Sequence, residues 1–393
     1  MPAKAVPQAR KPKHVAILTS ALAYGGAEVQ LVRLALALKA RGWQVDIVMM
    51  LPSEAFVGEL KAQGVGLHCL EMQQGLSVRG GLTGVRGLAR AVKVLRQLRP
   101  DLLVSFNFPG NALGRVAGRL AGVPIIVSSI RNEFFGGARR EQFMRLTGSV
   151  DAATTTNSQL AADSLVRRGI VQPSKLHLTP NGLTEAQFQT YPAEAQQLRR
   201  ALGVTEDTFL WVAVGRLEPQ KAYPNLFRAL KQLVEDRNTG QVALLVAGQG
   251  RLYGDLEALI TSLGLGEQVR LLGLRKDVPV LLSAADAFVL ASSWEGLPNV
   301  LMEALAAATP AVATTVGGVE ELLQAGETGY TAPPDDPEAL AEAMRRMMAH
   351  STEKRAAMGR KGQAFIRERY GLEWVMDIWE GLFVALLEQK SLT

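Results

Sequence analysis

The sequence predicts an α/β protein built from two doubly wound domains, each with a mainly parallel sheet. Short apolar runs alternate with helical patterns along the whole chain, which is typical of βαβ units. Near residue 209 the pattern restarts with strand, glycine turn and helix in succession. At 393 residues the chain is long for one domain and comfortable for two.

The first strand is expected at residues 14–20, HVAILTS, and it leads through Gly25 and Gly26 into a helix over residues 27–41. Other strands of the first half are expected at 45–51, 102–106, 124–129, 151–158 and 175–182. Strands of the second half are expected at 209–214, 242–250, 269–273, 286–293 and 310–315.

These elements define three regions of the chain. Residues 1–190 form the first doubly wound domain, and residues 191–370 form the second. Residues 185–204 are polar and carry no strand, so they are expected to form a connection. Residues 371–393 show apolar residues at helical spacing, and this helix is expected to pack back toward the first domain. Ligands of such sheets bind beyond the carboxyl ends of the strands, so the cleft between the domains is the expected site.

Composition and charge limit the class of protein. Hydrophobic residues make up 48% and charged residues 20%, as in ordinary folded proteins. No apolar run approaches the roughly 20 residues of a membrane-spanning helix, and no apolar signal segment precedes the first strand, so a cytoplasmic location is expected. Cys69 is the single cysteine, which excludes an intramolecular disulfide. We expect Cys69 to be buried and to pack as a small apolar residue.

The charge is divided unevenly along the chain. Residues 1–190 hold 23 Lys and Arg against 11 Asp and Glu, whereas the remainder holds 20 against 26. The first half is therefore basic, which suits docking to an anionic membrane surface or a lipid phosphate, at the inner face of the membrane, or else a solvated surface.

Two acids stand eight residues apart in SSWEGLPNVLMEALAAATP, residues 292–310. Pro298 suits the first turn of a helix, which puts Glu295 in the entry loop and Glu303 in the second turn. Both side chains then reach one ligand at the helix start, where the N–H groups of Asn299 and Val300 can hold a diphosphate. An acid near a helix start is also favourable through the helix dipole, which would explain Glu295 alone but explains Glu303 poorly, because Glu303 lies deeper in the helix.

Two cations complement these acids. Arg216 directly follows the strand at 209–214, and Lys221 comes five residues later in the loop GRLEPQK. Fixed cations at a strand's carboxyl end can clamp a diphosphate and stabilise the charge that develops as it leaves, or they can simply be solvated. The loop at Gly25 and Gly26 lets a phosphate approach the backbone, although it does not follow the G-x-G-x-x-G pattern.

Several chemistries have no motif in the sequence. There is no H-E-x-x-H, P-loop, G-x-S-x-G or Asp-x-Asp sequence. The four histidines are scattered, and three lie in or beside apolar strands. A histidine base, a metal and a bound cofactor are therefore not expected.

The segments GRLEPQK and VLASSWEGLPNVLMEALAAATPAVATTVGGVEELL together resemble the family 4 glycosyltransferases, retaining enzymes of the GT-B fold. YGGAE, TNSQLAADSL and LTPNGL in the first half are similar to that family as well. The resemblance implies a nucleotide sugar bound by the second domain and a glycan or lipid-linked acceptor bound by the first. It implies no nucleic-acid partner. It also implies that no metal is needed, because an oxygen of the leaving phosphate takes the acceptor's proton.

The resemblance also implies roles for individual residues. Arg216 and Lys221 would hold the leaving diphosphate, Glu295 the hydroxyls of the donor sugar, and Glu303 the ribose. The remaining donor contacts would come from Leu297, Asn299 and Val300, from Leu274 and Arg275 at the base, and from Gly25 and Gly26. Arg131 and Asn132 replace a histidine found in many relatives and would face the acceptor or the donor sugar. The EGLPNV variant suggests a UDP-sugar, including N-acetylated ones.

Two other readings stay open at this point. A sugar-nucleotide epimerase of the same fold would need a base, for which no histidine near the cleft is expected. A non-catalytic relative that binds membrane or nucleic acid would use the basic first half. The set formed by Arg216, Lys221, Glu295 and Glu303 favours the transferase, acting in the synthesis of cell-surface polysaccharide or glycoconjugate.

Overall fold

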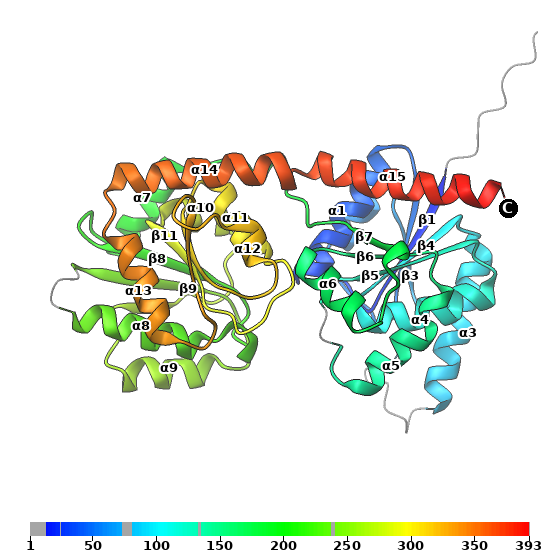
Figure 1. The fold of residues 1–393 in the computed structure, drawn as a ribbon, viewed down its shortest axis with the longest axis horizontal. Coiled ribbons are helices and arrows are strands. Elements are labelled where there is room, and N and C mark those ends of the chain that lie inside the picture. Colours follow the sequence, from blue (N-terminus) through cyan, green and yellow to red (C-terminus); the bar gives the residue numbers. More distant parts are fainter. Residues whose placement is uncertain (1–12, 24, 73–80, 133–134, 237–239, 393) are drawn as a thin grey trace, which may run out of the picture. The chain divides into compact units, whose positions relative to one another are not determined.

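A computed structural model describes residues 13–23, 25–72, 81–132, 135–236 and 240–392 (Figure 1). The chain forms two compact units. Unit 1 comprises residues 1–156, 162–179 and 376–393, and unit 2 comprises residues 157–161 and 180–375. The chain thus leaves unit 1 for unit 2 at Pro180 and returns at Met376.

Unit 1 contains a parallel sheet of seven strands among its described residues, in the order β3-β2-β1-β4-β5-β6-β7. Every neighbouring pair is parallel. The strands are β1 (His14–Thr19), β2 (Gln44–Met49), β3 (Gly66–Cys69), β4 (Leu102–Phe106), β5 (Ile125–Ile130), β6 (Ala153–Thr156) and β7 (Leu176–Leu178). The five inner strands are almost entirely buried, as expected for strands covered by helices on each side, whereas the edge strands β3 and β7 are partly exposed.

The helices of unit 1 connect and cover these strands. They are α1 (Gly26–Ala40), α2 (Val57–Ala62), α3 (Gly81–Leu98), α4 (Asn107–Ala121), α5 (Ala138–Thr147), most of α6 (Gln159–Arg167) and most of α15 (Leu372–Ser391), with short 3-10 turns at Gly148–Val150 and Pro173–Lys175. Helices α3 and α4 share a core with β1, β2 and β4 that includes Leu18, Leu95 and Leu103.

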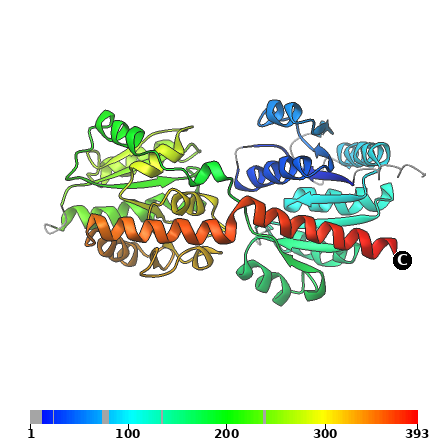
Figure 2. The same cartoon turned by 90° about the horizontal axis from the view of Figure 1, so that it is seen from above.

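Most of helix α15 lies along the other elements of unit 1 (Figure 2), and aromatic side chains make the contact. The rings of Trp379 and Phe106 are stacked with centroids 6.3 Å apart, and the rings of Phe383 and Trp43 meet edge to face at 5.9 Å. Glu380 of α15 also accepts a hydrogen bond of 2.8 Å from the indole N–H of Trp43. Residues 376–391 thus belong to unit 1.

A buried ion pair connects α4 to the segment just before the start of β6. The guanidinium group of Arg115 binds the carboxylate of Asp151 at 2.5 Å, with both side chains almost fully buried. Ser128 donates to the same carboxylate at 2.9 Å, and Met144 and Thr147 accept the remaining guanidinium bonds at 2.8 Å. Burial raises the pKa of Asp151, and Arg115 opposes that effect. The network is structural and lies away from the carboxyl ends of the strands.

Unit 2 repeats the architecture with a six-stranded parallel sheet in the order β10-β9-β8-β11-β12-β13 among its described residues. The strands are β8 (Phe209–Val214), β9 (Val242–Ala247), β10 (Val269–Leu271), β11 (Ala287–Leu290), β12 (Ala311–Thr314) and β13 (Gly329–Ala332). The helices are α7 (Pro192–Ala201), α8 (Tyr223–Glu235), α9 (Tyr253–Ser262), α10 (Val278–Ala284), α11 (Asn299–Ala306), α12 (Val319–Leu322), α13 (Pro337–Met348) and α14 (Thr352–Tyr370), with 3-10 turns at Glu185–Phe188 and Pro219–Lys221.

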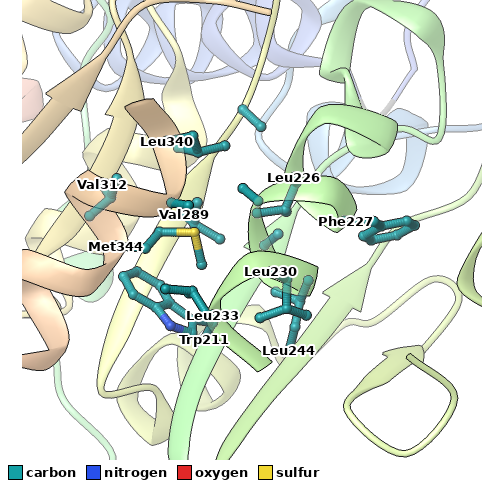
Figure 3. Close-up of a cluster of buried hydrophobic side chains, with 14 of the residues drawn as sticks. Trp211, Leu226, Phe227, Leu230, Leu233, Leu244, Val289, Val312, Leu340 and Met344 are labelled. Atoms are coloured by element: carbon teal, nitrogen blue, oxygen red, sulfur yellow. The ribbon is translucent and has the colours of Figure 1, made fainter. Parts of the chain in front are cut away.

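Two apolar layers enclose this second sheet. Helices α8, α9 and α13 cover one face with a core centred on Trp211, Phe227 and Met344 (Figure 3). Helices α7, α10, α11 and α14 cover the opposite face, where Phe288 and Leu305 are fully buried. The strands are rigidly held between these layers, so the loops at their carboxyl ends have fixed origins.

Most expected elements are present, and the differences have local causes. Strands β3 and β13 were not expected, because each has four residues and contains glycine and polar side chains. The expected connection at 185–204 instead contains α7, which packs on α10. The chain enters unit 2 at Pro180 rather than at residue 191. Cys69 is exposed, not buried, because it ends the edge strand β3.

No helix in the described residues is long and apolar enough to cross a membrane.

Candidate active site

The expected donor residues of unit 2 gather where its strand order reverses. Strands β8 and β11 are neighbours, although two strands separate them in the sequence, so the sheet is wound outward in both directions from this pair. Ligands of open α/β sheets bind at such a switch point, outside the carboxyl ends of the strands. Arg216 and Lys221 follow β8, and Glu295 follows β11.

Lys221 and Glu295 form an ion pair at this point. The ammonium nitrogen lies 2.5 Å from Glu295 Oε1, and the two side chains are 14% and 9% exposed. The buried hydroxyl of Ser292 donates to the same carboxylate oxygen at 2.7 Å, and the amide of Gln220 donates to Oε2 at 3.3 Å. Three donors therefore fix the carboxylate, which keeps acceptor capacity on Oε2 for a ligand hydroxyl.

A positive-φ residue and a tyrosine place Lys221. Residues 219–221 form a 3-10 turn that ends at Ala222, whose φ is 46°. The next residue, Tyr223, begins α8 and donates its hydroxyl to Gly215 O at 3.1 Å. Burial, and then the charge of Glu295, raise the pKa of the Tyr223 hydroxyl, so it stays a hydrogen-bond donor. A Cβ on Gly215 would lie 3.1 Å from Lys221 Cε, so glycine there leaves room for the lysine stem.

Arg216 is exposed and joins the same group through Gln220. Its Nη2 donates to Gln220 Oε1 at 3.4 Å, and Gln220 donates to Trp294 O at 2.9 Å. The backbone closes this link, because Ser293 N donates to Gln220 O at 2.9 Å. Gln220 thus connects the loop that carries the cations to the loop that carries Glu295. Its only sequence signal was its place between Arg216 and Lys221.

Helix α11 starts at the same end of the sheet. Its first residue is Asn299, one position later than the expected start at Pro298, which is the N-cap residue, and no side chain caps that end. The Asn181 side chain fixes the entry loop by donating to Leu297 O at 3.0 Å and to Asn299 Oδ1 at 2.6 Å. Leu297 itself is buried. The first-turn N–H groups, including that of Val300, point out of the helix start, where they can bind an anion.

Glu303 lies in the second turn of α11, as expected. Its Oε1 accepts a hydrogen bond of 3.1 Å from Gln187 Nε2, and the side chain is half-buried. Gln187 belongs to the 3-10 turn at residues 185–188, whose Thr184 forms a capping box with it. Neither Asn181 nor Gln187 was singled out from the sequence, because their contacts join segments more than a hundred residues apart.

Gly317 and Gly318 support the loop that carries Glu295. Gly317 has φ +53°, and a Cβ there would lie 2.3 Å from Gly296 O and 2.4 Å from Glu295 O. Gly318 N donates to Gly296 O at 2.7 Å. The Glu295 backbone is thus seated directly on this glycine pair, and a side chain at Gly317 would displace it.

Leu274 and Arg275 lie in the loop after β10, at the same sheet edge. Arg275 binds Asp277 with two bonds of 2.8 and 2.5 Å, and the hydrogen bond from Arg275 lowers the pKa of Asp277. Leu274 is 60% exposed, an unusual position for a large apolar side chain. Its contact with the base of a nucleotide remains a prediction.

In unit 1, Gly25 and Gly26 lie at the start of α1, after β1 and next to the switch point of that sheet. A Cβ on Gly25 would lie 2.3 Å from a carboxylate oxygen of Glu28. The Glu28 side chain therefore lies over the helix start, and it also accepts a hydrogen bond of 3.4 Å from Asn107. A phosphate that approached this loop would compete with Glu28, a residue that the sequence did not single out.

Arg131 directly follows β5, as expected, but its side chain is buried. It is 7% exposed, and its Nη1 donates to Thr179 O at 2.5 Å. Its guanidinium carbon lies 5.7 Å from the ring centres of both Phe106 and Trp379. This packing is structural, so a direct contact of Arg131 with a sugar is not what the geometry favours. The neighbouring Asn132 is exposed at the same strand end.

No group of three or more His, Cys, Asp or Glu side chains that could hold a metal occurs within the described residues. Metal independence remains a prediction.

Two family models match nearly consecutive parts of the chain. The model of group 1 glycosyl transferases matches residues 194–365, and the model of the glycosyl transferase 4-like domain matches residues 25–182. The chain is a family 4 glycosyltransferase. The first match falls within unit 2, and the second covers most of unit 1 but not β1 or α15.

Curated relatives and solved structures agree with this assignment. The glycosyltransferase is 27% identical to the Escherichia coli UDP-Gal:alpha-D-GlcNAc-diphosphoundecaprenol alpha-1,3-galactosyltransferase, over 67% of this chain and 70% of the relative. It is 28% identical to D-inositol 3-phosphate glycosyltransferase 1 of Catenulispora acidiphila, over 85% of this chain and 86% of the relative. Anabaena HepE in complex with UDP-glucose superimposes with a TM-score of 0.81 at 24% identity, covering 94% of this chain and 99% of HepE. The expected GT-B fold is confirmed.

Proposed function

We propose that this glycosyltransferase moves a sugar from a UDP-sugar to a glycan or lipid-linked acceptor, with retention of configuration and without a metal. The observation that carries the proposal is the Lys221–Glu295 pair at the switch point of unit 2. Similarity to a UDP-Gal-dependent relative and to a UDP-glucose complex supports UDP as the nucleotide. We propose that the acceptor is an intermediate in the synthesis of a cell-surface polysaccharide or glycoconjugate. The enzyme would act on it in the cytoplasm.

The cations of this site suit a leaving diphosphate. An ammonium group has three N–H donors, and Glu295 uses one of those of Lys221. The other two can bind phosphate oxygens, together with Arg216 and the first turn of α11. Fixed donors of this kind stabilise the negative charge that grows on the diphosphate as the glycosidic bond breaks. In the proposed mechanism a phosphate oxygen then accepts the proton of the incoming hydroxyl.

The acids suit the neutral parts of the donor. Glu295 is already neutralised by Lys221, so its remaining acceptor sites can bind sugar hydroxyls without repelling the phosphates. Glu303 lies in the second turn of α11 and can accept hydrogen bonds from hydroxyls of the ribose. The two carboxylates thus lie at different depths, one in the entry loop and one in the helix, which supports contacts with the sugar and the ribose of one donor over hydrolysis by paired acids.

We also propose that unit 1 contacts an anionic membrane through α3. The helix carries four basic residues and no acidic one, and all four are exposed: Arg86, Arg90, Lys93 and Arg96, called here the basic face of α3. Val85 on this helix is 66% exposed, and Leu120, whose carbonyl accepts a bond from Arg96, is 54% exposed. Basic residues beside exposed apolar ones suit a lipid surface.

The test begins with a screen of nucleotide sugars for thermal stabilisation, because ligands that bind the native state raise its melting temperature. With the donor that stabilises most, Lys221→Met should lower the transfer rate by about 10²–10³-fold, the usual effect of removing one fixed donor to a developing charge. Product anomers are read by NMR, and an α-linked product from an α-linked donor supports retention.

Controls separate chemistry from folding. Lys221→Met leaves the Glu295 carboxylate buried without its cation, which should cost roughly 1–3 kcal/mol of unfolding free energy. The double variant Lys221→Met, Glu295→Gln removes both charges and should regain stability but not activity. Lys231→Met, in an exposed pair with Glu235 at the other end of α8, should change neither. Full transfer by a folded Lys221→Met protein would contradict the diphosphate role.

A further inference from the structure

The two segments by which the chain leaves and re-enters unit 1 are bound to each other on the side of unit 2. Leu183 N donates to Tyr370 O at 2.8 Å, and Leu372 N donates to Leu183 O at 2.7 Å, so Leu183 and Gly371 form a parallel bridge. A Cβ on Gly182 would lie 2.9 Å from the Leu372 side chain, which shows how closely the segments pack. They are therefore constrained to move as a pair.

On the side of unit 1, a single guanidinium group contacts both segments. Arg131 Nη1 donates to the carbonyl of Thr179, the last residue before the chain leaves unit 1. The same guanidinium faces the ring of Trp379, which lies in α15 three residues after the chain returns to unit 1 at Met376. The Phe106 ring, at the end of β4, completes the contact.

This arrangement is expensive for the stability of unit 1 alone. Arg131 is nine-tenths buried, its Nε has no hydrogen-bond partner, and no acidic side chain of the described residues pairs with it. Burial lowers the pKa of its guanidinium to about 9. A buried charge without a counter-charge is unfavourable, and an apolar side chain of similar length would fill the space without that penalty. What the guanidinium adds is the simultaneous bond to Thr179 and contact with Trp379.

We propose that Arg131 is a positioning residue that clamps the two connecting segments to unit 1 beside the end of β5. The inference rests on the proposed function, in which unit 2 binds the donor and unit 1 the acceptor. Transfer then depends on how firmly the connecting segments are held, whereas binding of UDP to unit 2 does not. Asn132, exposed at the same strand end, puts the clamp next to the surface where an acceptor would bind.

Arg131→Met tests the clamp because methionine keeps the apolar volume and removes the bond and the charge. We expect kcat to fall about ten- to hundredfold, as for a small misplacement of reacting groups, with an unchanged dissociation constant for UDP. The midpoint of urea unfolding should stay equal or rise. Amide hydrogen exchange in residues 371–378, measured without substrate, should become faster.

Three comparisons make the result decisive. Arg131→Lys keeps a donor for Thr179 O and should recover part of kcat and of the exchange protection. Trp379→Leu should lower kcat as well, and the double variant should lose less than the product of the single losses, because both act on one contact. Arg140→Met removes an exposed guanidinium stacked on Phe108 in the same unit and should leave kcat unchanged.

The clamp is refuted if folded Arg131→Met has wild-type kcat and exchange, or if its loss of kcat follows a fall in the unfolding midpoint. If the wild-type protein transfers no sugar from any UDP-sugar, the proposed function fails instead. The exchange measurement then still tests whether Arg131 holds the connecting segments.

Discussion

Replacing Gly317 by alanine tests how precisely the loop of Glu295 must be placed. The new Cβ would lie 2.3 Å from Gly296 O and 2.4 Å from Glu295 O, whereas ordinary contact begins at 3.4 Å. Both obstacles are backbone atoms, so they cannot rotate away as the end of a flexible side chain would. The Glu295 loop must therefore shift by about 1 Å, a displacement known to matter for reacting groups.

The magnitude follows from two separate effects. Alanine at the φ of +53° that Gly317 adopts costs roughly 1–2 kcal/mol, because a Cβ is unfavourable in the left-handed region. Forcing the loop outward adds roughly 1–3 kcal/mol of overpacking. A shift of the Glu295 backbone also alters its pairing with Lys221, and we expect the transfer rate to fall about a hundredfold.

The assay combines three measurements on each variant. Urea unfolding gives stability, calorimetry gives the dissociation constant for UDP, and the initial rate at saturating donor gives kcat. Gly203→Ala is the matched control within unit 2, because its φ is +66° but no heavy atom lies within 4 Å of the added Cβ. It shares the backbone strain without the steric displacement, so it should lose roughly 1 kcal/mol of stability and keep its activity.

If folded Gly317→Ala transferred sugar within twofold of the wild-type rate, the position of the Glu295 loop would not limit transfer. If Gly203→Ala lost as much activity as Gly317→Ala, backbone strain in unit 2 would explain the loss and the position of Glu295 would not.

Two further predictions concern unit 1. Asp46 accepts hydrogen bonds from His14 and His68 at 2.8 and 2.7 Å; burial raises its pKa, but the two histidines outweigh burial and hold that pKa well below its usual range. The stabilisation that depends on the charge of Asp46 is therefore complete above about pH 4 and is lost as the pH falls further. Asp46→Asn should consequently lower the midpoint of urea unfolding more at pH 7 than at pH 3. Equal losses at the two pH values would contradict this. Reversing two charges on the basic face of α3 with glutamate should abolish sedimentation with anionic liposomes at low salt, whereas the same change at Lys354 and Arg360 of α14 should not. Equal binding by both double variants would remove α3 as the membrane contact.

The sequence was sufficient for the fold class because parallel strands that are buried on both faces leave continuous apolar runs. The runs at β1, β8 and β9 are of this kind, and each was expected within a few residues of its observed position. Strands β3 and β13 lie at the edges of their sheets and have mixed composition, so their runs carry too little signal. They form because a neighbouring strand supplies their hydrogen bonds.

The candidate site shows the same division at the level of single residues. Arg216, Lys221 and Glu295 could be selected because each follows a recognisable strand, and strand ends are where ligands bind in this fold class. Gln220, Asn181 and Gln187 could not, because their roles depend on partners from distant segments of the chain. Such contacts leave no periodic pattern in the sequence.

By itself the sequence determined the two doubly wound domains, the family, and the loops that carry charge beside the switch point of unit 2. Only the tertiary structure decided that Lys221 and Glu295 neutralise each other, and that Arg131 is buried against Thr179 and Trp379. The physical reason is that residue type and local spacing fix which element forms. The partner of a charged side chain depends on which strand ends and helices the folded chain brings together around it.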